Sequence, residues 1–120
     1  MNRLLLISCL LLSACGPRVE VLNLDKVPPT EKAQAASIEI YQTGHNVRSK
    51  IIAPVEATSC KHLLTDPPPS KADATNQLRI KTLRMGGNVI TDYSCDDFGT
   101  DTWGTNCWAS VTCAGNAGKK

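Results

Sequence analysis

Aromatic residues are scarce in this chain: tryptophan, tyrosine and phenylalanine together make up 4% of its 120 residues. Aromatic side chains supply much of the buried area in most protein cores, so their scarcity predicts a small core. In a domain below about 80 residues, such a core seldom contributes more than 3–5 kcal/mol to stability. The composition therefore indicates that covalent cross-links help to hold the fold together.

The chain also lacks a strong excess of charge and the short motifs of common catalytic sites. Its formal net charge is +2, too small and too evenly spread to indicate nucleic-acid binding. It has no Gly-x-Ser-x-Gly, His-Glu-x-x-His or phosphate-binding loop. We therefore expect a protein that is not an enzyme and binds no cofactor. A hydrolase or inhibitor whose working residues lie far apart in the sequence is the competing class.

No two cysteines have the C-x-x-C spacing that zinc knuckles and thioredoxin-like sites use. A group of aspartates lacks the Asp-x-Asp-x-Asp-Gly order and closing glutamate of a calcium loop; its members are Asp92, Asp96, Asp97 and Asp101. His45 and His62 are isolated in polar, turn-like surroundings. We predict no metal site and expect these side chains to be solvated.

Residues 1–14 have the pattern of a secretory signal peptide. Arg3 follows the start, and residues 4–12 form an apolar run. That run is too short to cross a bilayer, which takes about 20 apolar residues. The next residues, Leu12-Ser13-Ala14-Cys15, resemble the lipobox of bacterial lipoproteins. The resemblance implies cleavage before Cys15 and attachment of lipid to its thiol; the alternative is an ordinary signal with an unmodified Cys15.

A lipidated Cys15 places the protein at a membrane. Two or more acyl chains hold a protein there, because each buried methylene adds about 0.8 kcal/mol. Gly16 stands where lipoproteins kept in the inner membrane tend to have Asp, so the likeness implies an outer-membrane lipoprotein whose domain faces the periplasm. Disulfides form in that compartment. Cys9 leaves with the signal and Cys15 takes lipid, so four of the six cysteines remain to pair.

Residues 15–36 are predicted to be the lipidated cysteine followed by a flexible tether. The segment holds Pro17, Pro28 and Pro29 among mixed charges, which is typical of disordered chain. The alternation over residues 19–24 could instead pair as an edge strand. When extended, about 21 residues reach roughly 70 Å, so the domain could work close to the membrane or far from it.

Residues 37–115 are predicted to form one domain with four strands and one helix. The first strand is expected at residues 37–41, where apolar residues alternate with period two, and the others at residues 51–57, 88–95 and 107–113. Pro54 favours an edge position or a bulge for its strand, since proline cannot donate to the ladder. The helix begins after Ser70, a suitable N-cap, and ends at Gly86-Gly87.

The order strand–strand–helix–strand–strand indicates an α+β fold, in which one helix covers one face of a small, mainly antiparallel sheet with two disulfides. The inner face of the helix is expected to carry Ala74, Leu78, Thr82 and Met85, widened by Ile80 and Leu83. Its basic residues are expected to face water; they are Lys71, Arg79, Lys81 and Arg84. Residues 116–120 form a Gly-rich basic tail that needs no order.

The two tryptophans have different expected roles. Trp103 lies in the polar loop 96–106, where it either contacts a partner, as tryptophan often does at interfaces, or covers the adjacent disulfide. Trp108 lies on a strand and is expected to pack in the core or against the helix. Together with Arg79 and Arg84 on the helix, Trp103 is the candidate partner-binding residue.

The remaining cysteines can pair in three ways; they are Cys60, Cys95, Cys107 and Cys113. Position along the chain favours Cys95 with Cys107, which would flank the loop of a hairpin. The layout, however, resembles that of the RcsF family. The likeness lies in the isolated Cys60, the segment 78–95, the C-x5-C spacing that ends at Cys113, and Gly115 just beyond it. The resemblance implies non-consecutive bridges, Cys60 to Cys107 and Cys95 to Cys113.

RcsF-family proteins are outer-membrane lipoproteins that sense envelope stress for the Rcs phosphorelay. The resemblance implies signal transduction without catalytic chemistry, by a change of protein partner. The implied partners are the outer membrane through the lipid, the barrel-assembly protein BamA, outer-membrane β-barrel proteins, and the inner-membrane Rcs repressor IgaA. The alternative is an assembly factor, inhibitor or structural lipoprotein with the same domain and another partner.

Overall fold

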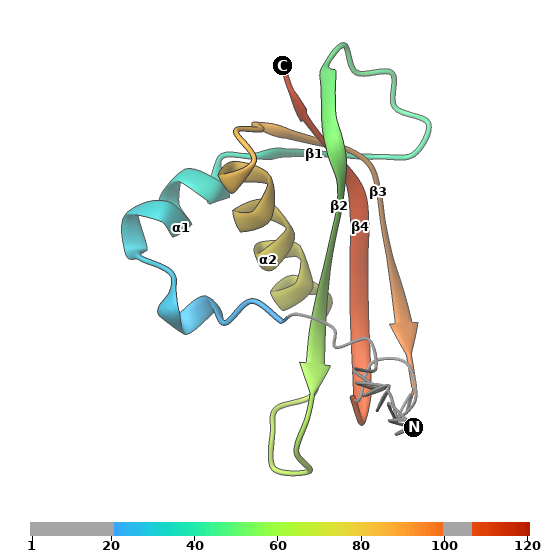
Figure 1. Cartoon of the computed structure of the whole chain (residues 1–120). Coiled ribbons are helices and arrows are strands. Elements are labelled where there is room, and N and C mark those ends of the chain that lie inside the picture. Colours follow the sequence, from blue (N-terminus) through green and yellow to red (C-terminus); the bar gives the residue numbers. More distant parts are fainter. Residues whose placement is uncertain (1–20, 100–106) are drawn as a thin grey trace, which may run out of the picture.

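A computed structural model of the chain describes residues 21–99 and 107–120. Within them one helix covers one face of a four-stranded sheet, and a second helix packs against the first (Figure 1). The elements are η1 (Leu24–Lys26, a 3₁₀ turn), α1 (Pro29–Ala36), β1 (Glu39–Gln42), β2 (Lys50–Lys61), α2 (Lys71–Arg84), β3 (Val89–Phe98) and β4 (Ala109–Lys119). Among the described residues, none of the helices has the length and apolar character needed to span a bilayer.

The sheet confirms the α+β class but is mixed. The strand order is β1-β3-β4-β2. β2 and β3 each run antiparallel to β4, whereas β1 lies parallel to β3. The prediction of a mainly antiparallel sheet thus did not anticipate the parallel pair of β1 and β3. Parallel neighbours need a long crossover, and here β2 and α2 lie between β1 and β3 in the chain.

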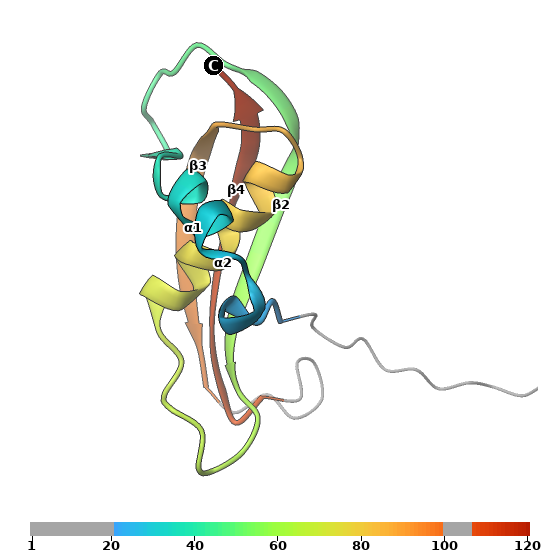
Figure 2. The same ribbon diagram turned by 90° about the vertical axis from the view of Figure 1, so that its left-hand side faces the viewer.

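The segment from residue 21 to residue 36 is packed on the domain, so the prediction of a flexible tether there is wrong. Val27 and Ala35 are buried together with Ile80 of α2, and α1 lies beside α2 in both views (Figure 2). The prolines suggested disorder, but Pro29 begins α1. A proline in the first helical turn lacks only an amide that would have no partner within the helix.

α2 begins and ends as predicted. Ser70 is its N-cap, and the Ser70 hydroxyl oxygen accepts a hydrogen bond from the Asp73 amide at 3.1 Å. Gly86 follows the helix with a φ of +83°, in the left-handed region that favours glycine. Both signals lie within a few residues of the helix ends, so the limits of α2 could be predicted from the sequence without the tertiary fold.

The inner face of α2 carries Ala74, Leu78 and Thr82, all fully buried as expected. Met85, which was also expected there, is 40% exposed because it is the C-cap residue beyond the last turn. Of the basic residues predicted to face water, two do and two are half-buried; the exposed pair is Lys71 and Arg84, and the half-buried pair is Arg79 and Lys81. Lys81 donates a hydrogen bond to the backbone oxygen of Glu56 at 2.9 Å.

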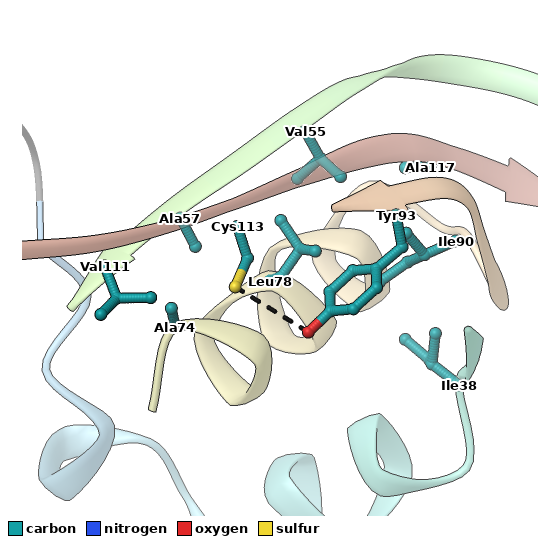
Figure 3. Packing of buried hydrophobic residues seen from close by; sticks show 10 residues of the cluster. All are labelled: Ile38, Val55, Ala57, Ala74, Leu78, Ile90, Tyr93, Val111, Cys113 and Ala117. Carbon is teal, nitrogen blue, oxygen red and sulfur yellow. Dashed lines mark hydrogen bonds between the residues drawn. The ribbon is translucent and has the colours of Figure 1, made fainter. Parts of the chain in front are cut away.

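The main core lies between α2 and the sheet (Figure 3). It contains Ile38, Val55, Ala57, Ala74, Leu78, Ile90, Tyr93, Val111, Cys113 and Ala117. Tyr93 is its aromatic member, and the Tyr93 hydroxyl lies 3.8 Å from the sulfur of Cys113. The other members of the core are five larger aliphatic residues, three alanines and Cys113.

The strands extend further than alternation predicted. β2 continues through Cys60 to Lys61, and β3 continues to Phe98. β4 continues to Lys119, so the prediction of a free tail over residues 116–120 is wrong. Lys119 pairs with Lys50 across the sheet. Pro54 lies on β2, which is an edge strand as predicted.

Candidate functional site

One disulfide joins β3 to β4, and the other joins β2 to a residue two positions before β4. Cys95 and Cys113 are direct partners on β3 and β4, with Cα atoms 4.0 Å apart, and Cys113 is fully buried under α2. Cys60 on β2 is joined to Cys107, with Cα atoms 5.5 Å apart. Because side chains alternate along a strand, Cys60 lies on the face opposite Ala57 of the core. The pairing of Cys95 with Cys107 that chain position favoured is wrong.

The two disulfides contribute much to the stability of so small a domain. They close segments of 47 and 18 residues. The chain-entropy relation gives about 4 kcal/mol for the longer segment and about 3 kcal/mol for the shorter one. Since whole domains are stable by about 5–15 kcal/mol, either bridge accounts for a substantial part of the total.

We call the end of the sheet formed by residues 60–66, 96–98 and 107–109 the cystine end. There His62 Nδ1 lies 3.5 Å from Cys60 Sγ. An Asp66 carboxylate oxygen accepts hydrogen bonds from the amides of His62 and Leu63, at 3.1 and 2.8 Å. The side-chain donor atoms of Cys60, His62 and Cys107 lie within 4.8 Å of one another. Both sulfurs form the disulfide, so neither is the thiolate that a metal ion binds.

Large apolar side chains are exposed at the cystine end. The exposed fractions are 62% for Leu63, 73% for Leu64, 47% for Phe98 and 48% for Trp108. The prediction that Trp108 packs in the core or against the helix is wrong. The Ser70 amide at the start of α2 donates to the Ser59 hydroxyl at 3.1 Å, so α2 begins level with Ser59 and covers none of the sheet beyond it.

A buried glutamine ties the N-terminal segment to the sheet. Gln77 is 1% exposed; its Oε1 accepts from the Leu22 amide at 3.2 Å, and its Nε2 donates to the Thr58 carbonyl at 3.1 Å and to Asp73 Oδ2 at 3.0 Å. Beside it, residues 21–25 and the cystine end together line an open cleft of about 490 Å³. Sequence analysis missed Gln77, although its spacing of three from Ala74 was a signal for the inner face.

The predicted partner residues fall in different places. Arg84 is tied to α1, because its Nε lies 2.6 Å from Glu31 Oε1. The hydrogen bond from Arg84 lowers the pKa of the Glu31 carboxyl. Arg79 lines a pocket of about 230 Å³ between α1 and α2, and its buried Nε has no hydrogen-bond partner among the described residues. Cys15 and Trp103 lie outside the described residues.

The other predicted surface residues are exposed. His45 and His62 both reach solvent, as do the aspartates that the structure describes; these are Asp92, Asp96 and Asp97. Asp101 lies outside the described residues. Asp92 has a φ of +52°, where the β3–β4 register shifts between Thr91 and Ser94. β3 therefore contains a β-bulge at Asp92, which changes the direction of the strand.

No protein-family model matches the sequence, and no curated protein matches it. Solved structures with a similar fold include that of a DUF74-family protein of unknown function from Pediococcus pentosaceus. That structure aligns with a TM-score of 0.50 at 20% identity, over 68% of this chain and 96% of the other. At this level of identity the likeness concerns the fold alone.

Proposed function

We propose that this protein is an outer-membrane lipoprotein that relays envelope stress to the Rcs phosphorelay through protein contacts, in the manner of the RcsF family. The observation that carries the proposal is the disulfide connectivity. Cys60 is bridged to Cys107 and Cys95 to Cys113, which is the one pairing of three that the resemblance implies. The lipobox that ends at Cys15 supports the anchoring.

Two surface ion pairs have shifted pKa values, Glu31 with Arg84 and Glu39 with Lys120. In each pair the main cause is the hydrogen bond between the partners, which lowers the pKa of the acid and raises that of the base. Each pair therefore stabilises a contact on the surface of the domain.

The packed N-terminal segment narrows the set of partners. From Cys15 to Leu22 the extended chain spans at most about 25 Å, and Leu22 is already bound to Gln77. The domain thus works close to its own membrane. Among the proposed partners, BamA and outer-membrane barrels lie within that reach, whereas IgaA would have to extend across the periplasm toward it.

The same short reach favours a second candidate function. An assembly factor or other accessory lipoprotein would act on partners in its own membrane and would need no contact with the inner membrane. The two functions differ in whether the partner set changes when the envelope is damaged.

Photo-crosslinking in cells distinguishes the two functions. Probes are placed at the exposed Asn76 of α2 and at the exposed His45 of the β1–β2 loop, and crosslinks are compared with and without envelope damage. A partner set that changes with damage supports the sensor, and an unchanged set contradicts it. The matched control is Cys15→Ser, which should leave the membrane fraction; a C15S protein that still sediments with membranes contradicts the lipid anchor.

A further inference from the structure

We propose that the cystine end is a membrane-contact surface, whose apolar side chains enter the headgroup region of the bilayer that anchors the protein. The side chains are Leu63, Leu64, Phe98 and Trp108. The inference rests on the lipid anchoring at Cys15 proposed above, and it adds to that function a fixed orientation of the domain on the membrane.

The four side chains come from three segments that meet at the same end of the sheet. Leu63 and Leu64 follow β2, Phe98 is the last residue of β3, and Trp108 immediately precedes β4. The register pairs Lys61 with Ala109 and Phe98 with Ser110, so the strand ends coincide at the lower end of the sheet in Figure 1. A group of exposed apolar side chains marks an interaction surface more strongly than a single one does.

The chemistry of this surface suits a lipid headgroup region. Tryptophan is enriched at membrane interfaces because its ring is amphipathic, and leucine and phenylalanine add apolar area. Charged side chains of both signs surround them, with the half-buried Lys61 close to Leu63 in the chain and the exposed Asp96 and Asp97 beside Phe98. The contact therefore depends on apolar insertion and only weakly on anionic lipid.

The short chain between Cys15 and Leu22, which we call the tether, favours membrane contact through the cystine end. Leu22 is held by Gln77, which also binds the Thr58 carbonyl. Thr58 lies three residues, or about 10 Å, from the end of β2 at Lys61. Because the chain from Leu22 back to Cys15 reaches at most about 25 Å, the lipidated residue lies no more than about 15 Å beyond the cystine end.

The opposite end of the sheet lies about as far from Thr58 as the tether can extend. Lys50 begins β2 eight residues from Thr58, a distance of about 26 Å. The tether would have to be fully extended for that end of the sheet to lie at the same height as the lipidated Cys15. The exposed Met85 is also remote from the cystine end, at the C-terminus of α2, so it provides a matched control position.

Fluorescence quenching by brominated lipid tests the orientation. The mature lipidated protein is reconstituted in phosphatidylethanolamine–phosphatidylglycerol vesicles that contain phospholipid brominated on its acyl chains. In a Trp103→Phe variant, Trp108 is the sole tryptophan. We expect its emission to fall about twofold or more, because an interfacial side chain lies 5–10 Å into the headgroup and acyl boundary. The control reporter, Met85→Trp in a W103F/W108F background, should not be quenched.

A second variant tests the leucines. Leu63→Ser with Leu64→Ser changes exposed side chains, so folding should be little affected, and we expect the quenching of Trp108 to fall by about half or more. Protein that does not stay with the vesicles contradicts the anchoring and hence the proposed function. Protein that stays, but whose Trp108 is quenched no more than the tryptophan at position 85, overturns the membrane-contact surface and leaves the anchoring intact.

Discussion

Replacing Gln77 with alanine tests whether the N-terminal segment belongs to the domain. The buried amide accepts a hydrogen bond from the Leu22 backbone and donates to the Thr58 carbonyl and to Asp73. The substitution removes all three contacts at once. It also leaves the carbonyl of Thr58, a residue that is 2% exposed, without its donor from α2.

The expected loss follows from the burial of each group. An unsatisfied buried acceptor costs about 1–3 kcal/mol, and removal of the Gln77 methylene from a buried site adds about 1 kcal/mol. Leu22 and Asp73 are only partly buried, so water replaces their lost bonds at little cost. We therefore expect Q77A to lower the free energy of unfolding by about 2–4 kcal/mol.

Urea unfolding followed by circular dichroism, with the disulfides intact, measures that loss. Hydrogen exchange at the Leu22 amide reports the segment itself, and should become faster in Q77A. The matched control is Gln34→Ala on the exposed side of α1, which should stay within about 0.5 kcal/mol of the parent. If Q77A is as stable as Q34A and Leu22 exchanges at its original rate, Gln77 does not hold the segment and residues 21–23 act as tether.

Further substitutions test the core, the close strand packing and the ion pair. Leu78→Ala empties a site that is 0% exposed and should cost about 2–5 kcal/mol by denaturant unfolding; a loss below 1 kcal/mol would show that the core repacks around it. Gly115→Ala would place a Cβ 2.7 Å from Ile90 Cγ2 and should cost about 1–3 kcal/mol, whereas an unchanged melting temperature would contradict that contact. The pKa of Glu31 is lowered below 4.5 by the hydrogen bond from Arg84, so the pair stabilises the fold above the unfolded pKa and loses that effect as pH falls through the folded one. Glu31→Gln should therefore melt below the parent at pH 7 and together with it in strong acid; a difference that persists in acid would mean that Glu31 acts through packing.

The parts of the fold that the sequence predicted correctly depend on neighbouring residues. Ser70 caps α2 through an amide three residues away, and Gly86 ends it through its own backbone freedom. Ala74 and Leu78 share a face because the helix repeats every 3.6 residues. Each signal is complete within a few residues, so no knowledge of the sheet was needed.

The parts that were missed depend on contacts between distant residues. Val27 and Ala35 are buried only because Ile80, far along the chain, is their neighbour. Ala117 and Gly118 carry little strand propensity of their own, and both pair with neighbours on either side of β4. The exposure of Trp108 likewise depends on what surrounds the end of the sheet, which no local pattern records.

The disulfides could be assigned only through the family likeness, because the strand order decides them. β4 lies between β2 and β3, so Cys113 faces Cys95 and Cys107 reaches Cys60 at the neighbouring edge. A hairpin of β3 and β4 considered alone gives no reason to leave Cys95 and Cys107 apart. The proposed membrane-contact surface was also beyond local patterns, since the proposal depends on the level at which Leu22 is held.

The central place of β4 has a consequence for biogenesis. β4 is synthesised after β2 and β3, yet it is inserted between them. Until residues 109–119 have emerged, β2 therefore has no partner in the sheet, and β3 can pair only with β1. Cys60 and Cys95 would wait as thiols during that time, open to oxidation with each other. A nascent chain arrested before β4 should therefore be alkylated at both positions, and the sheet should be completed only after β4 is released.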